Sequence, residues 1–393
     1  MTQRLKDIPS NILKAIFRPR EMAITAVAFL LIGMLRYVAF HVDVFNPVSQ
    51  AIKGFSTTDI FYDMMLATPA DTSSTIVIVD ITRLHDRDSI ATVLEEIDAL
   101  EPAAIDIDVV FEHPKEPVGD AHLFNVVATL SNAVFSFKMM DPDREKNEFT
   151  RQVHSFFAED LGVTEGFVNV DRSMTRDIPL CLEMRGKAYP SVIAQMMEVI
   201  EGKPFDYKNH RKQAIDYEPT SFRVIPYDSI QHYSQYITGH FVMFGGAYES
   251  VDVLYTPLGQ MYGIEVLCYA LKTMLEMKQQ TNCTGISFWL LAILFSYIGV
   301  CLIMAYKDKV LSMKDGKILT DIMRTIFITS LVIFFIMAVF MTIAFIFFIK
   351  WRINFDLTPT LTVMALTTMA ADIFRITVKH AWPNIYKRLF PNY

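Results

Sequence analysis

The 393-residue sequence has few cysteines, few charged residues and no excess of basic residues, and each shortage excludes a class of protein. Four cysteines without close pairs are too few for a disulfide-built scaffold. The 36 Lys and Arg stand against 43 Asp and Glu, and the net charge of −7 argues against a basic nucleic-acid-binding protein. The nine histidines show no metal-ligand spacing, so neither a metal site nor a cofactor is expected.

What the sequence has in excess is apolar residues, which make up 52% of the chain. That share is high for a soluble domain and indicates a membrane protein. A helix needs about 20 apolar residues to cross a bilayer. Four runs meet that requirement, at 23–42, 285–305, 325–349 and 357–374. The fourth run contains five threonines, which predicts packing against neighbouring helices.

The distribution of Lys and Arg around these runs predicts their orientation. Fourteen cations lie near the N-terminus, between the second and third runs, and after the fourth; two lie in the 350–356 hairpin. Both termini are therefore expected in the cytoplasm, with the spans in contact with membrane lipid. The expected divisions are a cytoplasmic N-terminus (1–22), a span (23–42), an extracytoplasmic domain (43–284), a span (285–305), a cytoplasmic loop (306–324), a span (325–349), an outer hairpin (350–356), a span (357–374) and a cytoplasmic tail (375–393).

The outer segment alternates between strand-like and helix-like patterns. Buried strands are predicted at 75–81, 103–111 and 133–139, separated by amphipathic helices that start at Asp88 and at Gly119. Further predicted elements are a hairpin around Arg185-Gly186, a helix at 190–201, a strand at 240–245 and a helix at 263–278. The predicted fold is an α/β outer domain with a mixed, partly parallel sheet and flanking helices, plus four transmembrane α-helices.

Several segments, taken in order, resemble a known family. They are "STIVIVDI", "VLEEIDALEPAAIDIDVVFEHP" followed by Gly119-Asp120, "GFVNV" with "RDIPL", and "GHFVMFGGAYESVD" with "YTPLG" and "GIEVLCYAL". Over about 45–375 the chain resembles the second type of CHASE extracellular sensor domain, with its N-terminal anchor and three C-terminal spans. That family is bacterial, so the resemblance implies a protein of the bacterial inner membrane. The aromatic-proline-Arg element that often precedes the second helix of that family is missing, because "RLHDRDS" stands there. The turn before Arg176 also lacks its usual glycine.

The resemblance carries an expectation about signal output. Members of this family usually carry a cyclase, kinase or diguanylate-cyclase domain after the last span. Here 19 residues follow the fourth predicted span, which is too short for an enzyme domain. The resemblance therefore implies that the output passes through a membrane or cytoplasmic protein partner, or through a homo-oligomer.

Three aspartates follow the predicted strands. Asp106 and Asp108 lie two residues apart and so share one face of a strand, and Asp80 ends the preceding strand. We expect them at the carboxyl ends of the strands, where α/β sheets bind ligands. They could cap loops or accept backbone hydrogen bonds, bind an organic ligand or a cation, or form a catalytic pair.

Other candidate ligand-binding residues follow from the same segments. Asp252 and Thr256 follow the late strand, next to Gly245-Gly246, which suits either a tight turn or a close backbone approach. Asp120 is a candidate through the resemblance. Arg176 could bind a ligand, but a structural ion pair with one of these acids is preferred.

Two cysteines of the outer segment and the small residues of the second span complete the list. Cys181 and Cys268 could form a disulfide, although small buried residues are the commoner role. Ala292, Ser296 and Gly299 share roughly one helix face and predict close helix packing.

These observations leave two main hypotheses. The first is a sensor or receptor-like membrane subunit that signals through a separate partner. The second is a non-catalytic structural or accessory subunit of a bacterial envelope complex. An enzyme using Asp80, Asp106 or Asp108 is the weakest alternative, because no nucleophile–base pair is visible, and the protein is expected not to be an enzyme.

Overall fold

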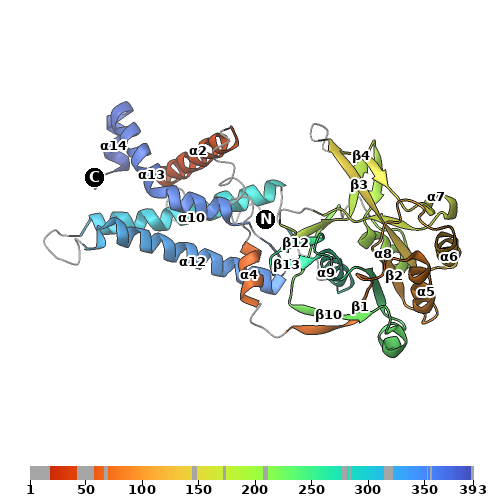
Figure 1. Cartoon of the computed structure of the whole chain (residues 1–393). Helices are drawn as coiled ribbons and strands as arrows, with labels where there is room; N and C mark the ends of the chain where they lie inside the picture. Colours follow the sequence, from red (N-terminus) through yellow and green to blue (C-terminus); the bar gives the residue numbers. More distant parts are fainter. Residues whose placement is uncertain are drawn as a thin grey trace, which may run out of the picture. The chain divides into compact units, whose positions relative to one another are not determined.

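The computed structural model describes residues 18–41, 57–65, 70–143, 148–170, 174–206, 211–276, 281–282, 285–313, 322–351, 353–354 and 356–390. The chain divides into two compact units. One consists of residues 1–57 and 281–393 and contains the long apolar helices. The other consists of residues 58–280 and contains the main sheet (Figure 1).

The helical unit contains three helices that are long and apolar enough to cross a membrane. These candidate spans cover Ile286–Leu311, Ile326–Trp351 and Thr358–Ala381. They correspond to helices α10 (Gly285–Leu311), α12 (Ile326–Trp351) and α13 (Thr358–Ala381), and they confirm three of the four predicted spans. Helix α2 (Pro19–His41) coincides with the predicted N-terminal span, which stays a prediction. The unit also holds α14 (Pro383–Leu389) and a two-stranded sheet of β14 (Thr281–Asn282) and β15 (Ile353–Asn354).

Small and hydroxylated residues join the helices of this unit, as predicted. A side chain at Gly299 of α10 would collide with Met364 of α13, so the glycine permits close approach of the two helices. Thr360 of α13 is fully buried and donates a hydrogen bond to the Ala292 carbonyl at 3.4 Å. Helix α2 packs against α10 and α13 through Ile24 and Ala28.

The second unit is built on a seven-stranded sheet with the order β10-β1-β11-β2-β3-β4, to which β5 adds beside β3. All neighbouring strands are parallel except β3 and β4, so the predicted mixed, partly parallel sheet is confirmed. The late strand β11 lies between β1 and β2, and the register pairs Ile76 with Phe241 and Val242 with Ile105. The strands are β1 (Asp71–Asp80), β2 (Ala104–Ile107), β3 (Ala133–Asp143), β4 (Glu148–Val153), β5 (Glu165–Phe167), β10 (Thr220–Pro226) and β11 (Phe241–Gly245).

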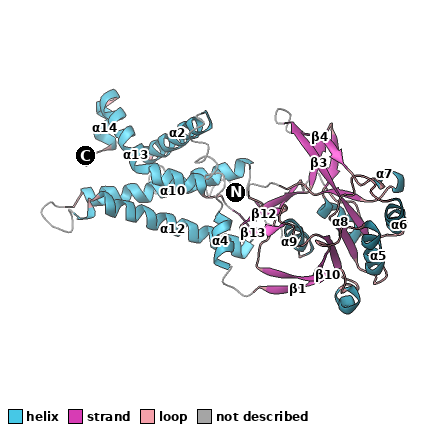
Figure 2. Ribbon diagram, in the orientation of Figure 1, coloured by secondary structure: helices cyan, strands magenta, loops and turns pink. Residues whose placement is uncertain are grey.

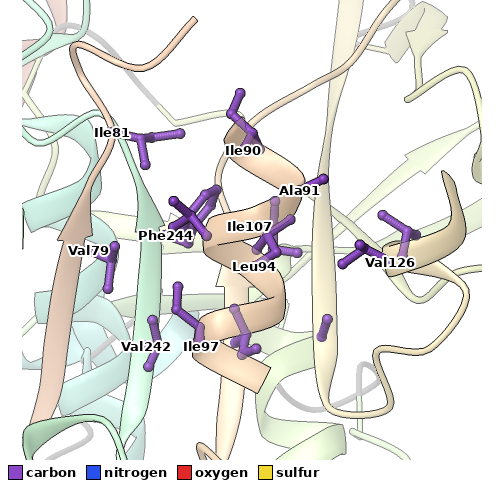
Figure 3. Close-up of a cluster of buried hydrophobic side chains, with 14 of the residues drawn as sticks. Val79, Ile81, Ile90, Ala91, Leu94, Ile97, Ile107, Val126, Val242 and Phe244 are labelled. Atoms are coloured by element: carbon purple, nitrogen blue, oxygen red, sulfur yellow. The ribbon is translucent and has the colours of Figure 1, made fainter. Parts of the chain in front are cut away.

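Helices cover both faces of this sheet (Figure 2). The face that carries Val79, Ile107 and Phe244 packs against α5 (Arg87–Asp98) and α6 (Pro117–Val127) (Figure 3). Each fully buried leucine or isoleucine there contributes ~2 kcal/mol of burial free energy. Strand alternation places Ile78, Asp106 and Met243 on the opposite face. The helices α8 (Val192–Glu201) and α9 (Gly263–Leu275) contact strands of the same sheet.

The remaining elements are short. They are α4 (Thr57–Met65), α7 (Ala158–Leu161), the 3-10 helix η2 (Ile230–Tyr236), and three two-stranded sheets. These sheets pair β6 (Asp177–Pro179) with β9 (Lys212–Ala214), β7 (Cys181–Met184) with β8 (Lys187–Pro190), and β12 (Val253–Thr256) with β13 (Gly259–Tyr262). The hairpin predicted around Arg185-Gly186 is the β7–β8 pair.

Two predicted helix starts were wrong by a few residues. The N-cap of α5 is Asp86, because its Oδ2 accepts a hydrogen bond from the Ser89 N–H at 2.8 Å, and Asp88 lies inside the first turn. Helix α8 starts after Ser191, whose Oγ accepts from the Ala194 N–H. Pro190 ends β8 instead of opening the helix, since it pairs with Cys181.

Candidate functional site

The carboxyl edge of the sheet has the arrangement at which α/β proteins bind ligands. Helices α5 and α6 follow β1 and β2 and pack on one face. The strand between them, β11, is followed by the β12–β13 hairpin and then by α9. Ile264 of α9 borders Gly245, which lies on the same face as Met243 and opposite to Phe244. The connections from neighbouring strands thus pack on opposite faces of the sheet, and the carboxyl ends of such strands are where α/β proteins commonly bind ligands.

Asp106 lies within β2, paired with Met243 and Val134, and its exposed fraction is 0%. Neither of its carboxyl oxygens has a hydrogen-bond partner among the described residues. Burial, and then the charge of Asp108, raises the pKa of Asp106 well above its usual value. Burial therefore favours the protonated, uncharged form of this carboxyl. Asp106 is the last residue but one of β2, so the prediction that it lies near the carboxyl end of its strand was confirmed, although it is buried there.

Asp108 follows the end of β2 and is half-buried. Burial, and then the neighbouring Asp252, raises its pKa to about 6. Lys138 of β3 acts in the opposite direction, and Glu249 adds to the rise. The structure thus brings together three of the predicted residues, Asp106, Asp108 and Asp252.

Three glycines make room for this group of carboxyls. A side chain at Gly245 would lie 3.2 Å from Cβ of Asp108 and 3.0 Å from Cδ1 of Ile264. A side chain at Gly246 would collide with Glu249, and one at Gly263 would collide with the carboxylate of Asp252. Gly245-Gly246 therefore permits a close approach, as one of the two alternatives predicted, but the groups that approach are acidic side chains of the same domain.

Helix α9 contributes two further groups beside the carboxyls. Its Glu265 accepts a hydrogen bond from the Tyr262 N–H at 3.3 Å, and burial raises the pKa of Glu265. Cys268 is fully buried; burial, then Asp106, raises the pKa of its thiol well above the usual value. On β3, the buried hydroxyl of Ser136 lies near Asp108 and acts to lower the pKa of that carboxyl.

Asp80 has the structural role that was one of its predicted alternatives. Its Oδ1 accepts hydrogen bonds from the Thr82 N–H at 2.9 Å, the Thr82 hydroxyl at 2.5 Å and the Ala247 N–H at 3.0 Å. It therefore joins the loop after β1 to the loop after β11. These hydrogen bonds fix the positions of the two loops relative to each other.

Asp120 lies apart from this group, in the first turn of α6. Its carboxylate pairs with the buried guanidinium of Arg87 and accepts from the N–H groups of Lys115 (2.7 Å) and Glu116 (2.9 Å). Burial opposes ionisation, but these hydrogen bonds outweigh it and lower the pKa of Asp120. Arg87 also lies over the ring of Phe156 at 5.1 Å. The sequence reasoning missed Arg87, although it lies in the "RLHDRDS" segment that replaces the expected element.

Arg176 and Thr256 have structural partners elsewhere. Arg176 forms a two-bond ion pair with Asp59 of α4, with Nε–Oδ1 at 2.8 Å and Nη2–Oδ2 at 2.6 Å. The expectation of an ion pair was confirmed, but its partner is none of the predicted acids. Thr256 donates to the Gly259 carbonyl at 2.9 Å within the β12–β13 turn.

The described residues contain neither a disulfide between Cys181 and Cys268 nor a group of side chains placed to bind a metal ion. Cys181 and Cys268 are free and buried, so they are not a disulfide. Burial also raises the pKa of the Cys181 thiol, which makes it a poor nucleophile. In the part of the chain that the structure describes, no three His, Cys, Asp or Glu side chains are grouped so that they could hold a metal ion.

Comparisons with known proteins give one match. The family model of the CHASE2 domain matches residues 22–306. Neither the curated proteins nor the solved structures include a match to this chain.

Proposed function

Because the chain belongs to the CHASE2 domain family, we propose that it is an integral membrane sensor subunit that signals through a separate partner protein. CHASE2 domains are extracellular sensor domains, and three helices here are long and apolar enough to span a membrane. In this proposal the domain at 43–284 lies in the bacterial periplasm and receives the signal. The chain itself performs no catalysis.

The observation that carries the proposal concerns α9. Its first turn, Gly263-Ile264, borders the cluster of acidic side chains that includes Asp108 and Asp252. Its last residue, Leu275, precedes the candidate span α10 by nine residues of chain. A change at the carboxyl edge of the sheet that favours one position of α9 therefore acts on a helix that nine residues of chain connect to a candidate membrane span.

The membrane topology in this proposal has four spans, with α2 as the first. Support comes from the apolar run at 23–42 and from the packing of α2 against α10 and α13. The surplus of Lys and Arg near the chain ends supports cytoplasmic termini. Arg20 of α2 binds Asp308 of α10 at 2.5 Å, which ties the ends of these two helices together.

A second candidate function is an accessory subunit of an envelope complex, and an exposed apolar surface favours it. Strand β12 alternates between buried and exposed residues, so Val253 and Tyr255 share an exposed face. Val251, just before the strand, is 84% exposed. Exposed apolar residues of this kind are typical of a protein-binding surface.

The experiment that tests both functions is purification of the tagged full-length protein from its native host in mild detergent. Co-purifying proteins are identified and quantified by mass spectrometry. A near-equimolar partner with a cytoplasmic catalytic domain supports the sensor. A near-equimolar transporter, secretion or respiratory subunit supports the accessory function, and recovery of the chain alone contradicts both.

A matched variant separates the two modes of partner binding. Val253→Lys with Tyr255→Lys changes only exposed side chains and is expected to leave folding intact. The sensor proposal expects the partner to remain bound, because the contact is made by the membrane helices or on the cytoplasmic side. Loss of the partner in this variant favours docking on the outer domain and the accessory function.

A further inference from the structure

The cluster of acidic side chains at the carboxyl ends of the strands contains a buried aspartate whose carboxyl oxygens have no hydrogen-bond partner among the described residues. Asp106 is fully buried, and neither oxygen is hydrogen-bonded within the described ranges. Asp108 follows it on the same face, so the unpaired carboxyl is directed to the side of the sheet on which the other acids gather. Leaving a buried carboxylate charged and unpaired costs far more than protonating it. Burial therefore favours a proton bound to Asp106.

Charged and titratable groups face Asp108 from each neighbouring element. They are Asp106 on β2, Lys138 on β3, Glu249 and Asp252 between β11 and β12, and Cys268 on α9, which in turn lies near Glu265. The acids outnumber the single cation in this group. Burial and the neighbouring Asp252 raise the pKa of Asp108 to about 6, so its charge changes near physiological pH.

The first turn of α9 is the element that this charge would move. Asp108 and Ile264 both border Gly245, with Cβ of Asp108 3.2 Å and Cδ1 of Ile264 3.0 Å from the position that a side chain would take there. The carboxylate of Asp252 lies against Gly263, and the Gly263 N–H donates to the Asp252 carbonyl at 2.9 Å. Repulsion between Asp108 and Asp252 therefore acts within the contact that holds α9 to the sheet.

Other cationic ligands fit this arrangement less well than a proton. The described side chains include no group of three or more acids, histidines or cysteines placed to hold a metal ion. A cavity of about 490 Å³ lies at α6, and its lining includes Pro114, Phe124 and Phe156 but none of Asp106, Asp108, Glu249 or Asp252. A proton needs no cavity and no fixed coordination geometry.

We infer that Asp106, Asp108, Glu249 and Asp252 form a proton-responsive contact between the sheet and α9. The inference rests on the sensor function proposed above and names its stimulus as the pH outside the cytoplasm. At low pH the contact is neutral and α9 is held against the sheet. At higher pH, Asp108 ionises, repels Asp252 and loosens the first turn of α9.

The test is hydrogen–deuterium exchange of the full-length protein in phosphatidylcholine nanodiscs at pH 5, 6, 7 and 8, corrected for intrinsic exchange rates. The readout is the protection of peptides from α9, with α5 as an internal reference. We expect α9 protection to fall about tenfold across a midpoint near pH 6, as for a shift of one pKa unit. The α5 peptides should not change. A flat α9 profile overturns the inference.

Three variants locate the response. Asp108→Asn is expected to hold α9 in the protected state at every pH, while the exposed control Glu159→Gln should behave as wild type. Asp252→Asn removes the charge that Asp108 repels, so the fall in α9 protection should become smaller and its midpoint should move below pH 6. An unchanged pH profile in both Asp108→Asn and Asp252→Asn overturns the assignment to this cluster, and either variant alone suffices if the other fails to fold.

Two additions separate the proton from other cations. At pH 7, millimolar magnesium or calcium chloride, or millimolar putrescine, should leave α9 unprotected. Protection by a divalent cation, or by the diamine, overturns the proton as the stimulus. If a partner co-purifies but α9 protection does not change with pH, this inference is contradicted and the proposed sensor function is not. If α9 protection changes with pH but no partner co-purifies, the sensor function is contradicted and the proton-responsive contact is not.

Discussion

The two faces of the central sheet are both covered by helices, but they differ in whether the polar groups buried there have hydrogen-bond partners. On the α5–α6 face the interior is apolar, and Asp120 beside it is paired with Arg87 and two backbone N–H groups. On the other face, Asp106 is buried, and neither of its carboxyl oxygens has a hydrogen-bond partner among the residues that the structure describes. Satisfied groups stabilise one arrangement, whereas unsatisfied groups leave a face sensitive to protonation.

The two aspartates show this difference in a single property. Hydrogen bonds outweigh burial and lower the pKa of Asp120, while burial and Asp108 raise the pKa of Asp106. Identical side chains are therefore shifted in opposite directions, Asp106 toward its protonated form and Asp120 toward its ionised form. The α5–α6 face serves packing, and the α9 face supplies the group through which we propose that the domain responds.

The largest effect is expected from Leu94→Ala, in the middle of α5. Leu94 is fully buried, so its truncation removes apolar contact and leaves a cavity, at a cost of ~4 kcal/mol in the free energy of unfolding. Pulse proteolysis of the full-length protein in urea measures this loss. The exposed Thr92→Ala on the same helix is the control, with less than about 0.5 kcal/mol expected. A loss below about 1 kcal/mol for Leu94→Ala would show that this face is loosely packed.

A somewhat smaller loss is expected from Arg87→Met, which leaves Asp120 without its cation. Breaking a buried ion pair on one side costs ~3 kcal/mol. The same proteolysis assay applies. Adding Asp120→Asn should recover part of the loss, because the uncompensated charge disappears. Simple additivity of the two substitutions would contradict direct coupling of the pair.

The opposite sign is expected from Asp106→Leu on the other face. Leucine keeps the branching of the aspartate side chain and removes two unpaired oxygens, so the protein should gain ~1 kcal/mol in unfolding free energy at pH 7. Asp106→Asn is the matched control, since it keeps two polar atoms and should gain less. A loss comparable to that of Arg87→Met would mean that Asp106 has an essential polar partner.

The smallest effect is a pH slope that distinguishes Asp108 from Asp120. Because the folded pKa of Asp108 is raised to about 6, the folded state binds the extra proton, and stability falls as pH rises from about 4 to about 6. The lowered pKa of Asp120 contributes stability above the unfolded value that is lost only as pH falls below about 4. Allowing for solvent screening, the Asp108 contribution is ~1 kcal/mol.

Unfolding free energies measured between pH 4 and pH 7 test this slope. Asp108→Asn should flatten it, and Glu159→Gln should leave it unchanged. An equal slope in Asp108→Asn and wild type would assign the pH dependence to other groups.

Local patterns in the sequence were enough to predict much of the sheet. The apolar runs around Ile78, Ile105 and Phe135 are strands, and the periodic residues Ile90, Leu94 and Ile97 mark a buried helix face. The β12–β13 hairpin was not predicted. Its strands are four residues long and have exposed apolar side chains, so they lack the usual strand pattern. The position of β11 between β1 and β2 was also not predicted, because strand order depends on contacts between distant segments.

The sequence by itself determined that the chain contains membrane-length helices and an α/β domain, and that acids follow its strands. Hydropathy and residue periodicity are local properties, so they can be read without coordinates. Only the tertiary structure decided which acids are paired. Asp120 meets Arg87 from 33 residues away, and Arg176 meets Asp59 from 117 residues away. The pKa of Asp106 is raised because segments distant in the chain bury it, among them α9 over 150 residues later, and desolvation depends on what covers a group in the folded chain.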